Sequence, residues 1–172
     1  MNPVRSQRGD QRPDPREASP DSEAPPALGS VLDFMRLIWA VDHGLLRASR
    51  RMEASFGVTG PQRLVIRIVG RFPGIPAGHL ARLLHIHPST LTGIVARLER
   101  QGLLRRRSDP RDGRRWLLGL TDRGRVVDAA REGTAEAAVS SALDGIANDK
   151  IAAAREVLTA IARALASGEP GS

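Results

Sequence analysis

The sequence predicts a mainly α-helical chain with one small β-hairpin, and three observations support this fold class. Apolar residues recur at helical spacing along most of the chain. Two short strand-like runs, residues 103–108 and 116–120, flank a charged segment that contains the turn signal Asp112-Gly113. Aromatic residues make up only 3% of the 172 residues, while alanine and leucine are abundant, so we expect an aliphatic, helical core in a single domain.

The two ends of the chain are expected to lack regular structure. Residues 1–28 hold six of the twelve prolines, and their arginines and acidic residues nearly cancel to a net charge of −1. Such a stretch cannot bury enough apolar surface to order itself, so we predict a disordered tail. Residues 168–172 are expected to be a frayed end.

Residues 29–57 predict one long helix whose apolar face needs a partner helix. Apolar side chains step by three and four along its whole length. They are Val31, Met35, Ile38, Val41, Leu45, Ala48, Met52 and Phe56. A second set beside this stripe, Leu32, Trp39 and Leu46, widens the face.

Two shorter helices are predicted next. The first, at residues 62–71, ends at Phe72-Pro73-Gly74, because proline and glycine do not continue a helix. Its expected core residues are Leu64, Val65, Ile68 and Val69. Ile75 is expected to pair with the hairpin as a lone strand residue, and a helix at residues 77–84 leads into a turn at residues 85–87.

The helix predicted at residues 88–101 has two different faces. Proline at its first position and Gly102 just past its end mark both boundaries. Leu91, Ile94, Val95 and Leu98 form a stripe that should face a core. The opposite face carries Ser89, Gly93, Ala96 and Arg100, flanked by Thr92 and Arg97.

That second face suits a helix that lies deep in a groove. The major groove of B-DNA admits an α-helix, with hydroxyl side chains reading base edges, alanine touching a thymine methyl and arginine binding guanine or phosphate. An ordinary solvated helix has a similar composition. The helix alone therefore leaves both interpretations open.

Nearly all of the net charge of +7 lies in the segment that begins at the end of this helix. Residues 97–125 contain ten arginines against Glu99, Asp109, Asp112 and Asp122, a net charge of +6. So dense a patch repels itself unless an anionic partner shares it, and a phosphate backbone is the commonest such partner. This concentration favours double-stranded DNA as the partner.

Residues 58–125 resemble the MarR family of winged helix-turn-helix regulators. The runs that carry the resemblance are VTGPQRLVIRIV, HLARLLHIHPSTLTGIVARLERQGLL and DPRDGRRWLLGLT. The resemblance implies a homodimer in which each recognition helix enters a major groove and each wing a minor groove. It also implies that Arg114 is the minor-groove residue, held by an ion pair with Asp112. Gly93 and Ala96 depart from the family pattern, so no operator sequence is carried over.

The resemblance divides the chain into a DNA-binding domain, residues 58–125, between a dimerisation helix, residues 29–57, and C-terminal dimerisation helices, residues 126–167. We expect Thr121 to cap a helix that runs on to Leu143, Gly145 to interrupt it, and a final amphipathic helix to follow. The predicted DNA-binding residues are Ser89, Thr90, Thr92, Gly93, Ala96, Arg97, Arg100, Arg111, Asp112, Arg114 and Arg115.

The leading interpretation is a repressor that binds an inverted-repeat operator as a homodimer and is released by a small-molecule effector, often an aromatic acid or phenol in relatives. The alternative is a winged-helix module for protein–protein contact without specific DNA binding. Candidate effector-binding residues, in a crevice between dimerisation helices and DNA-binding lobe, are Trp39, His43, Arg47, Arg63 and Arg67. A surface or interface role for His43 and Arg47 is the other interpretation.

Several functional classes are not expected. The absence of cysteine excludes disulfides and thiol-based sensing. His79, His85 and His87 are too few for the four tight ligands of a zinc site, so neither a metal nor a cofactor is predicted. No pattern of nucleophile, base and orienting group indicates an enzyme. With no signal peptide and no apolar run near ~20 residues, we expect a soluble, cytoplasmic protein without a membrane partner.

Overall fold

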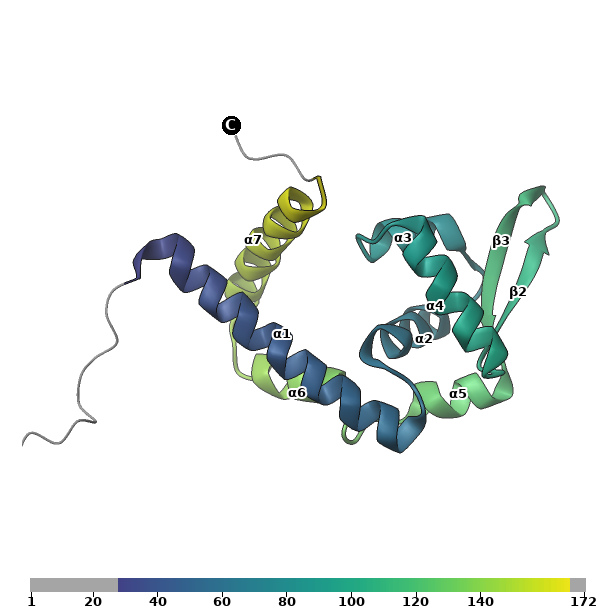
Figure 1. Ribbon diagram of the computed structural model, residues 1–172, viewed down its shortest axis with the longest axis horizontal. Coiled ribbons are helices and arrows are strands. Elements are labelled where there is room, and N and C mark those ends of the chain that lie inside the picture. The colour runs from purple at the N-terminus through teal and green to yellow at the C-terminus, as the bar shows by residue number, and fades with distance from the viewer. Residues whose placement is uncertain (1–27, 168–172) are drawn as a thin grey trace, which may run out of the picture. The chain divides into compact units, whose positions relative to one another are not determined.

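The structure, a computed structural model, describes residues 28–167. In chain order its elements are α1 (Gly29–Phe56), α2 (Gly60–Arg71), β1 (Ile75–Pro76), α3 (Ala77–Leu83), α4 (Pro88–Arg100), β2 (Leu104–Asp109), β3 (Asp112–Leu120), α5 (Asp122–Ala129), α6 (Ala135–Leu143) and α7 (Asn148–Ser167) (Figure 1). The mainly α fold with a small β-wing is confirmed. The expected tail and frayed end fall on residues 1–27 and 168–172, outside the described residues. Residues up to Leu37 form a unit of their own, so the packing below is that of residues 38–167.

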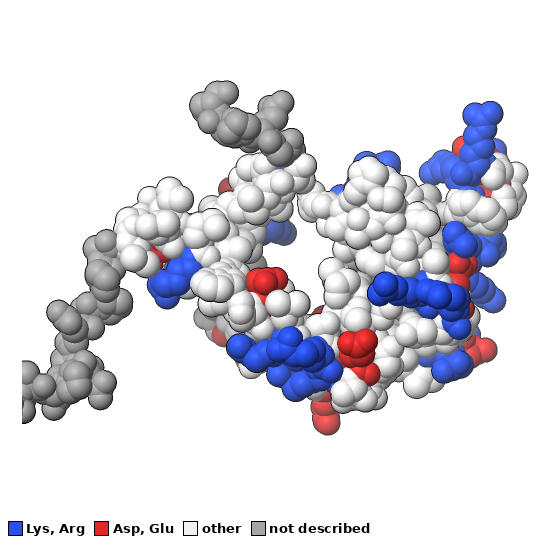
Figure 2. All heavy atoms as spheres, in the orientation of Figure 1, with Lys and Arg blue, Asp and Glu red and all other residues white. Residues whose placement is uncertain are grey.

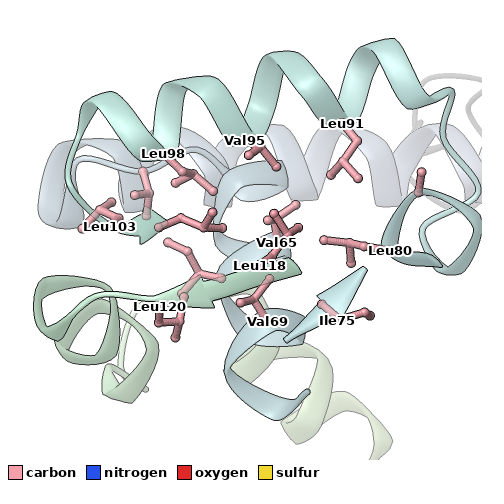
Figure 3. Packing of buried hydrophobic residues seen from close by; sticks show 14 residues of the cluster. Val65, Val69, Ile75, Leu80, Leu91, Val95, Leu98, Leu103, Leu118 and Leu120 are labelled. Carbon is pink, nitrogen blue, oxygen red and sulfur yellow. The ribbon is translucent and has the colours of Figure 1, made fainter. Parts of the chain in front are cut away.

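The hydrophobic core lies where α2, α3 and α4 pack against a three-stranded sheet. Figure 3 shows Val65 and Val69 of α2, Leu91, Val95 and Leu98 of α4, and Leu118 and Leu120 of β3 converging on one volume. Each is at most 7% exposed, which confirms the predicted core stripe of α4, the helix that corresponds to the recognition helix. Ile94 of that stripe is only partly buried.

The predicted core of α2 was wrong at one position. Leu64 is 47% exposed, whereas Ile66, not expected in the core, is fully buried. The helix is covered on more than one side, because α4, β3 and α5 all contact it. Its buried face therefore extends to Gln62, Arg63 and Ile66, and Leu64 faces an open cavity instead.

Local hydrogen bonds explain where the two central helices begin. Thr59 caps α2 in a capping box, because its backbone N–H donates to Gln62 Oε1 at 2.9 Å and its side chain accepts from the Gln62 N–H. His87 caps α4 through Nδ1, which accepts from the Ser89 N–H at 3.3 Å. The turn between α3 and α4 contains His85 at φ 53°, a left-handed conformation that is uncommon outside glycine. These contacts give His85 and His87 the turn role that the sequence indicated.

The sheet has the order β1-β3-β2 and is antiparallel throughout. Ile75 pairs with Leu118, as expected. The hairpin differs from the prediction, since the chain turns at Pro110-Arg111 and Asp112-Gly113 already belongs to β3. Asp109 Oδ1 accepts the Arg111 N–H at 2.9 Å, and Pro110 has a fixed φ that suits a turn. The hairpin therefore turns at Pro110-Arg111, before the chain reaches Asp112-Gly113.

The segment after the wing also differs from the prediction. Thr121 caps α5 as expected, with the Gly124 N–H donating to its hydroxyl at 3.1 Å. The single helix expected up to Leu143 is two helices, separated at residues 130–134. Gly133 adopts φ +70°, and Thr134 caps α6 by accepting the Ala137 N–H at 3.2 Å. A glycine followed by a capping threonine was the signal for this break.

Most of the apolar stripe of α1 is not covered. Of the predicted stripe only Ala48 and Met52 are buried, while Val41 and Leu45 are 61% and 47% exposed. Within residues 38–167, the partner helix that this stripe was predicted to need does not cover it. Within residues 28–167, no helix combines the length and apolar character needed to cross a membrane.

Candidate nucleic-acid interface and adjoining cavity

The recognition helix presents its predicted second face to solvent. Leu91, Val95 and Leu98 anchor the opposite side in the core. Except for the half-buried Ala96, the predicted DNA-facing residues of the helix are all exposed, namely Ser89, Thr90, Thr92, Gly93, Arg97 and Arg100. The small side chains at positions 93 and 96 leave this face shallow. A groove wall or base edge could therefore approach the helix backbone closely.

The wing continues this surface with basic side chains. Arg111, Asp112, Arg114 and Arg115 are all exposed on the hairpin. Figure 2 shows blue basic side chains gathering over the hairpin and the neighbouring end of α4. The structure differs from the prediction for Asp112, whose Oδ1 accepts the backbone N–H of Arg114 at 3.1 Å and forms no ion pair with its guanidinium. Asp112 thus shapes the backbone before Arg114 and leaves the Arg114 charge free.

Two of the ten arginines between residues 97 and 125 are already neutralised. Arg106 pairs with Glu99, with 2.8 Å between Nη2 and Oε2, and Arg125 pairs with Asp122. The other eight have no acidic partner within 4.0 Å among the described residues, and all are exposed. They are Arg97, Arg100, Arg105, Arg107, Arg111, Arg114, Arg115 and Arg123. Unneutralised guanidinium groups at this density create a strong positive potential, which suits a polyanion.

A cavity of about 910 Å³ adjoins the N-terminal half of the recognition helix, α4. Its walls come from the second half of α1, α2, the turn before α4, the start of α4 and α6. Apolar side chains dominate the lining, among them Leu45, Leu46, Leu64, Ile86, Ile94 and Val139. Sequence patterns placed Leu45, Leu46, Leu64 and Ile94 on packed helix faces and not in a cavity, because an apolar helical residue that lines a cavity has the same spacing as one that packs in a core.

The structure does not bring the five predicted effector residues together. Only Arg63 lines this cavity, and Arg67 lines a second, more polar one of about 690 Å³ that Arg63 shares. Trp39, His43 and Arg47 line neither. Trp39 is 66% exposed and meets the edge of the His43 ring, with 5.2 Å between the ring centroids.

Arg63 and Arg67 have structural contacts that their sequence position did not reveal. Arg63 is 1% exposed, donates from Nε to Glu136 Oε1 at 3.0 Å and donates from Nη2 to the Ala130 carbonyl at 2.6 Å. Its Nη1 donates to the Val127 carbonyl. Arg67, one turn later, donates to the Asp128 carbonyl at 3.0 Å and pairs with the Asp128 side chain. Both arginines therefore tie α2 to the junction of α5 and α6.

A helix-turn-helix followed by a two-stranded basic wing defines a winged helix-turn-helix protein. Residues 56–115 match the sequence model described as the MarR family. The described architecture is also that of the solved MarR family transcription regulator SP03579, which is 25% identical to this chain with a TM-score of 0.58, covering 80% of this chain and 88% of SP03579. The chain therefore carries a MarR-family module at residues 56–115.

Several individual proteins and solved structures are similar to this chain. The transcriptional regulator TtmR of Methylorubrum extorquens (strain PA1) is 35% identical over 101 residues, which cover 59% of this chain and 51% of TtmR. The chain thus spans about half the length of the curated relatives it matches. The PcaV regulator of Streptomyces coelicolor, solved with its natural ligand, is 26% identical with a TM-score of 0.62, covering 83% of this chain and 99% of PcaV. MepR of S. aureus, solved with DNA, shares the fold at 19% identity and a TM-score of 0.63, covering 77% of this chain and 97% of MepR.

Proposed function

We propose that this chain is a sequence-specific, double-stranded DNA-binding transcriptional regulator, a repressor that binds an inverted-repeat operator as a homodimer. The observation that carries the proposal is the set of eight exposed arginines on α4, the wing and the start of α5 that have no acidic partner within residues 28–167. Each guanidinium that meets a phosphate releases condensed counterions from the duplex, which drives association. The match of residues 56–115 to the MarR family and the DNA complex of MepR support the same function.

In each half of the proposed complex, α4 and the wing contact different grooves of the DNA. The exposed face of α4 would enter a major groove, where the hydroxyl of Thr90 and the guanidinium groups of Arg97 and Arg100 meet base edges or phosphates. The wing would place Arg114 at the adjacent minor groove. Because two-fold symmetry repeats this arrangement about 34 Å away, the operator should contain two inverted half-sites.

We also propose that the cavity of about 910 Å³ binds the effector that releases the operator. Its apolar walls suit an aromatic or phenolic molecule, and Thr90 and Ile94 of α4 line it. An occupant therefore contacts the recognition helix directly. It would release DNA only if it bound the DNA-incompetent arrangement more tightly, since equal affinity for both states shifts no equilibrium. The ligand complex of PcaV supports a ligand-responsive regulator.

Selection of bound sequences from a random duplex pool tests the proposal, followed by titration of the selected duplex at several salt concentrations. We expect an enriched inverted repeat and an affinity that falls steeply with salt, with a slope near −0.9 per phosphate contact. A winged helix used for protein–protein contact would enrich no sequence. Failure to bind duplexes of any sequence in dilute buffer would remove the proposed function.

The variant Arg114→Ala tests the role of the wing. We expect it to weaken operator binding by about 1 to 3 kcal/mol, because a groove-reading arginine is lost. The melting temperature should stay unchanged, since the side chain is exposed and makes no contact with the core. Arg155→Ala on α7 is the matched control and should bind like wild type, and an Arg114 variant with unaltered affinity would contradict the wing assignment.

A further inference from the structure

One of the wing arginines has a contact set unlike that of its neighbours. Arg106 of β2 faces Glu99, the second-to-last residue of α4, and the two side chains form a fork. Arg106 Nε donates to Glu99 Oε1 at 2.9 Å, while Nη2 lies 2.8 Å from Oε2. Two parallel hydrogen bonds of this kind fix direction as well as distance, and only the planar guanidinium group forms them.

The face of the same guanidinium is also occupied. Arg106 Cζ lies 5.5 Å from the centroid of the Trp116 ring, within the range of a cation–π contact. Arg106 pairs with Leu118 across the hairpin and Trp116 pairs with Ser108, so Arg106 and Trp116 are diagonal neighbours. Diagonal neighbours lie within reach of each other when one side chain is long and the other aromatic.

These contacts lie where the hairpin leaves the core. Leu118 is 1% exposed and belongs to the hydrophobic cluster, but Trp116, two residues further along the strand, is 48% exposed. Beyond Leu118 the core no longer holds the hairpin. Arg106 joins both strands to α4 at this boundary, through Glu99 on the helix and Trp116 on β3.

We propose that Glu99, Arg106 and Trp116 are positioning residues, a strut that sets the angle between the wing and the recognition helix. The proposal rests on the proposed DNA-binding function, because the angle matters only if both elements must enter grooves of one duplex. Arg106 therefore belongs to the architecture of the interface and does not bind phosphate. The strut is formed in the free protein, so the wing is oriented before DNA arrives.

Removing the acidic partner separates the strut from simple electrostatics. An acidic residue near DNA repels phosphate, so Glu99→Gln would tighten binding if charge alone mattered. The strut predicts the opposite, a loss of operator affinity of about tenfold, comparable to losing one hydrogen bond to a charged group. The amide of glutamine cannot accept two parallel hydrogen bonds, so the fork opens. Asp122→Asn is the charge-matched control and should bind as tightly as wild type or slightly tighter.

Changes at Arg106 give a second and independent test. Arg106→Lys keeps the charge but loses the fork, so we expect the same loss of about tenfold as for Glu99→Gln. A phosphate-binding role would instead leave the lysine variant close to wild type. The double variant Glu99→Gln with Arg106→Lys should bind no more weakly than either single variant, because both changes remove one interaction.

Trp116 fluorescence and the melting temperature, both measured without DNA, separate loss of the strut from loss of the fold. In a Trp39→Phe background, which leaves Trp116 as the only tryptophan, Glu99→Gln and Arg106→Lys should alter Trp116 fluorescence without DNA, with little change in melting temperature. If wild type binds its operator but Glu99→Gln binds equally or more tightly, or Arg106→Lys binds like wild type, the strut is refuted while the proposed function stands. If wild type binds no duplex at all, the proposed function fails, and the strut loses its purpose with it.

Discussion

At the scale of single residues, two helical glycines have opposite surroundings. A Cβ atom added at Gly93, on the exposed face of α4, would meet nothing within 4 Å. At Gly124, in the first turn of α5, it would lie 2.0 Å from the Leu103 carbonyl oxygen. Glycine costs helix stability at both positions, but only at Gly124 does close packing with backbone require it.

The same substitution should therefore change stability in opposite directions. Gly93→Ala should raise the free energy of unfolding by about 0.5 to 1 kcal/mol, because alanine favours the helix and meets open space. Gly124→Ala should lower it by about 1 to 3 kcal/mol, because α5 must move away from Leu103. Urea denaturation of both variants checks the pair. A stabilised Gly124 variant would show that α5 does not pack on Leu103 as described.

At the scale of elements, α2 holds the junction between α5 and α6 through arginine side chains. Arg63 donates to two carbonyl groups at the end of α5, those of Val127 and Ala130, and the Val127 carbonyl also accepts the Ala130 N–H at 3.2 Å. Arg63 also binds Glu136 in the first turn of α6. The winged domain is thereby attached to the segment that leads into the proposed dimerisation helices.

Replacing this arginine should loosen the junction. Arg63→Met should lower the free energy of unfolding by about 2 kcal/mol, because two carbonyl groups and the Glu136 carboxylate lose a buried donor. Arg67→Met is the matched comparison, and it should cost less because its side chain is 32% exposed and water can replace it. Equal losses in thermal or urea denaturation would contradict the burial difference.

At the scale of the whole molecule, apolar surface is left without cover. On α1 Trp39, Val41 and Leu46 are 66%, 61% and 48% exposed, and on α7 Leu158 and Leu165 are 57% and 72% exposed. Such surfaces in a monomer mark interaction sites. We therefore propose that a second copy of this chain covers them, in agreement with the operator symmetry proposed above.

A charge on this surface should break the dimer. Wild type should sediment as a dimer at micromolar concentration, and Val41→Glu should shift it to monomer, because burying an unpaired carboxylate is strongly unfavourable. Leu83→Glu, at a position 48% exposed on α3, should leave the dimer intact. Analytical ultracentrifugation checks both, and a dimeric Val41 variant would place the interface elsewhere.

Much of the DNA-binding module was predictable because its signals are local. The stripe of Leu91, Val95 and Leu98, the left-handed Gly102 and the Thr121 cap were each readable within a few residues, and the structure contains all three. The Pro110-Arg111 turn and the break at Gly133 were missed, although their signals are local too. The Asp112-Gly113 pair gave a competing signal for the turn, and the apolar stripe that continues past Gly133 gave a competing signal for one long helix.

The effector residues and the strut were not predictable in this way. Whether Arg63 reaches a ligand or a carbonyl group depends on Val127, Ala130 and Glu136, which lie more than 60 positions away in the chain. Leu64 and Ile66 have similar hydrophobicity, and only the elements packed around α2 decide which is exposed. The pairing of Arg106 with Glu99 likewise depends on how the wing folds back along α4.

The sequence by itself determined the helical periods, most of the helix boundaries and the concentration of arginine, because each depends on neighbours along the chain. Only the tertiary structure decided which arginines are free for an anion, which are tied to carboxylates and carbonyl groups, and where an apolar cavity remains. Those outcomes depend on what lies across a side chain in space, and the linear order of residues does not state it.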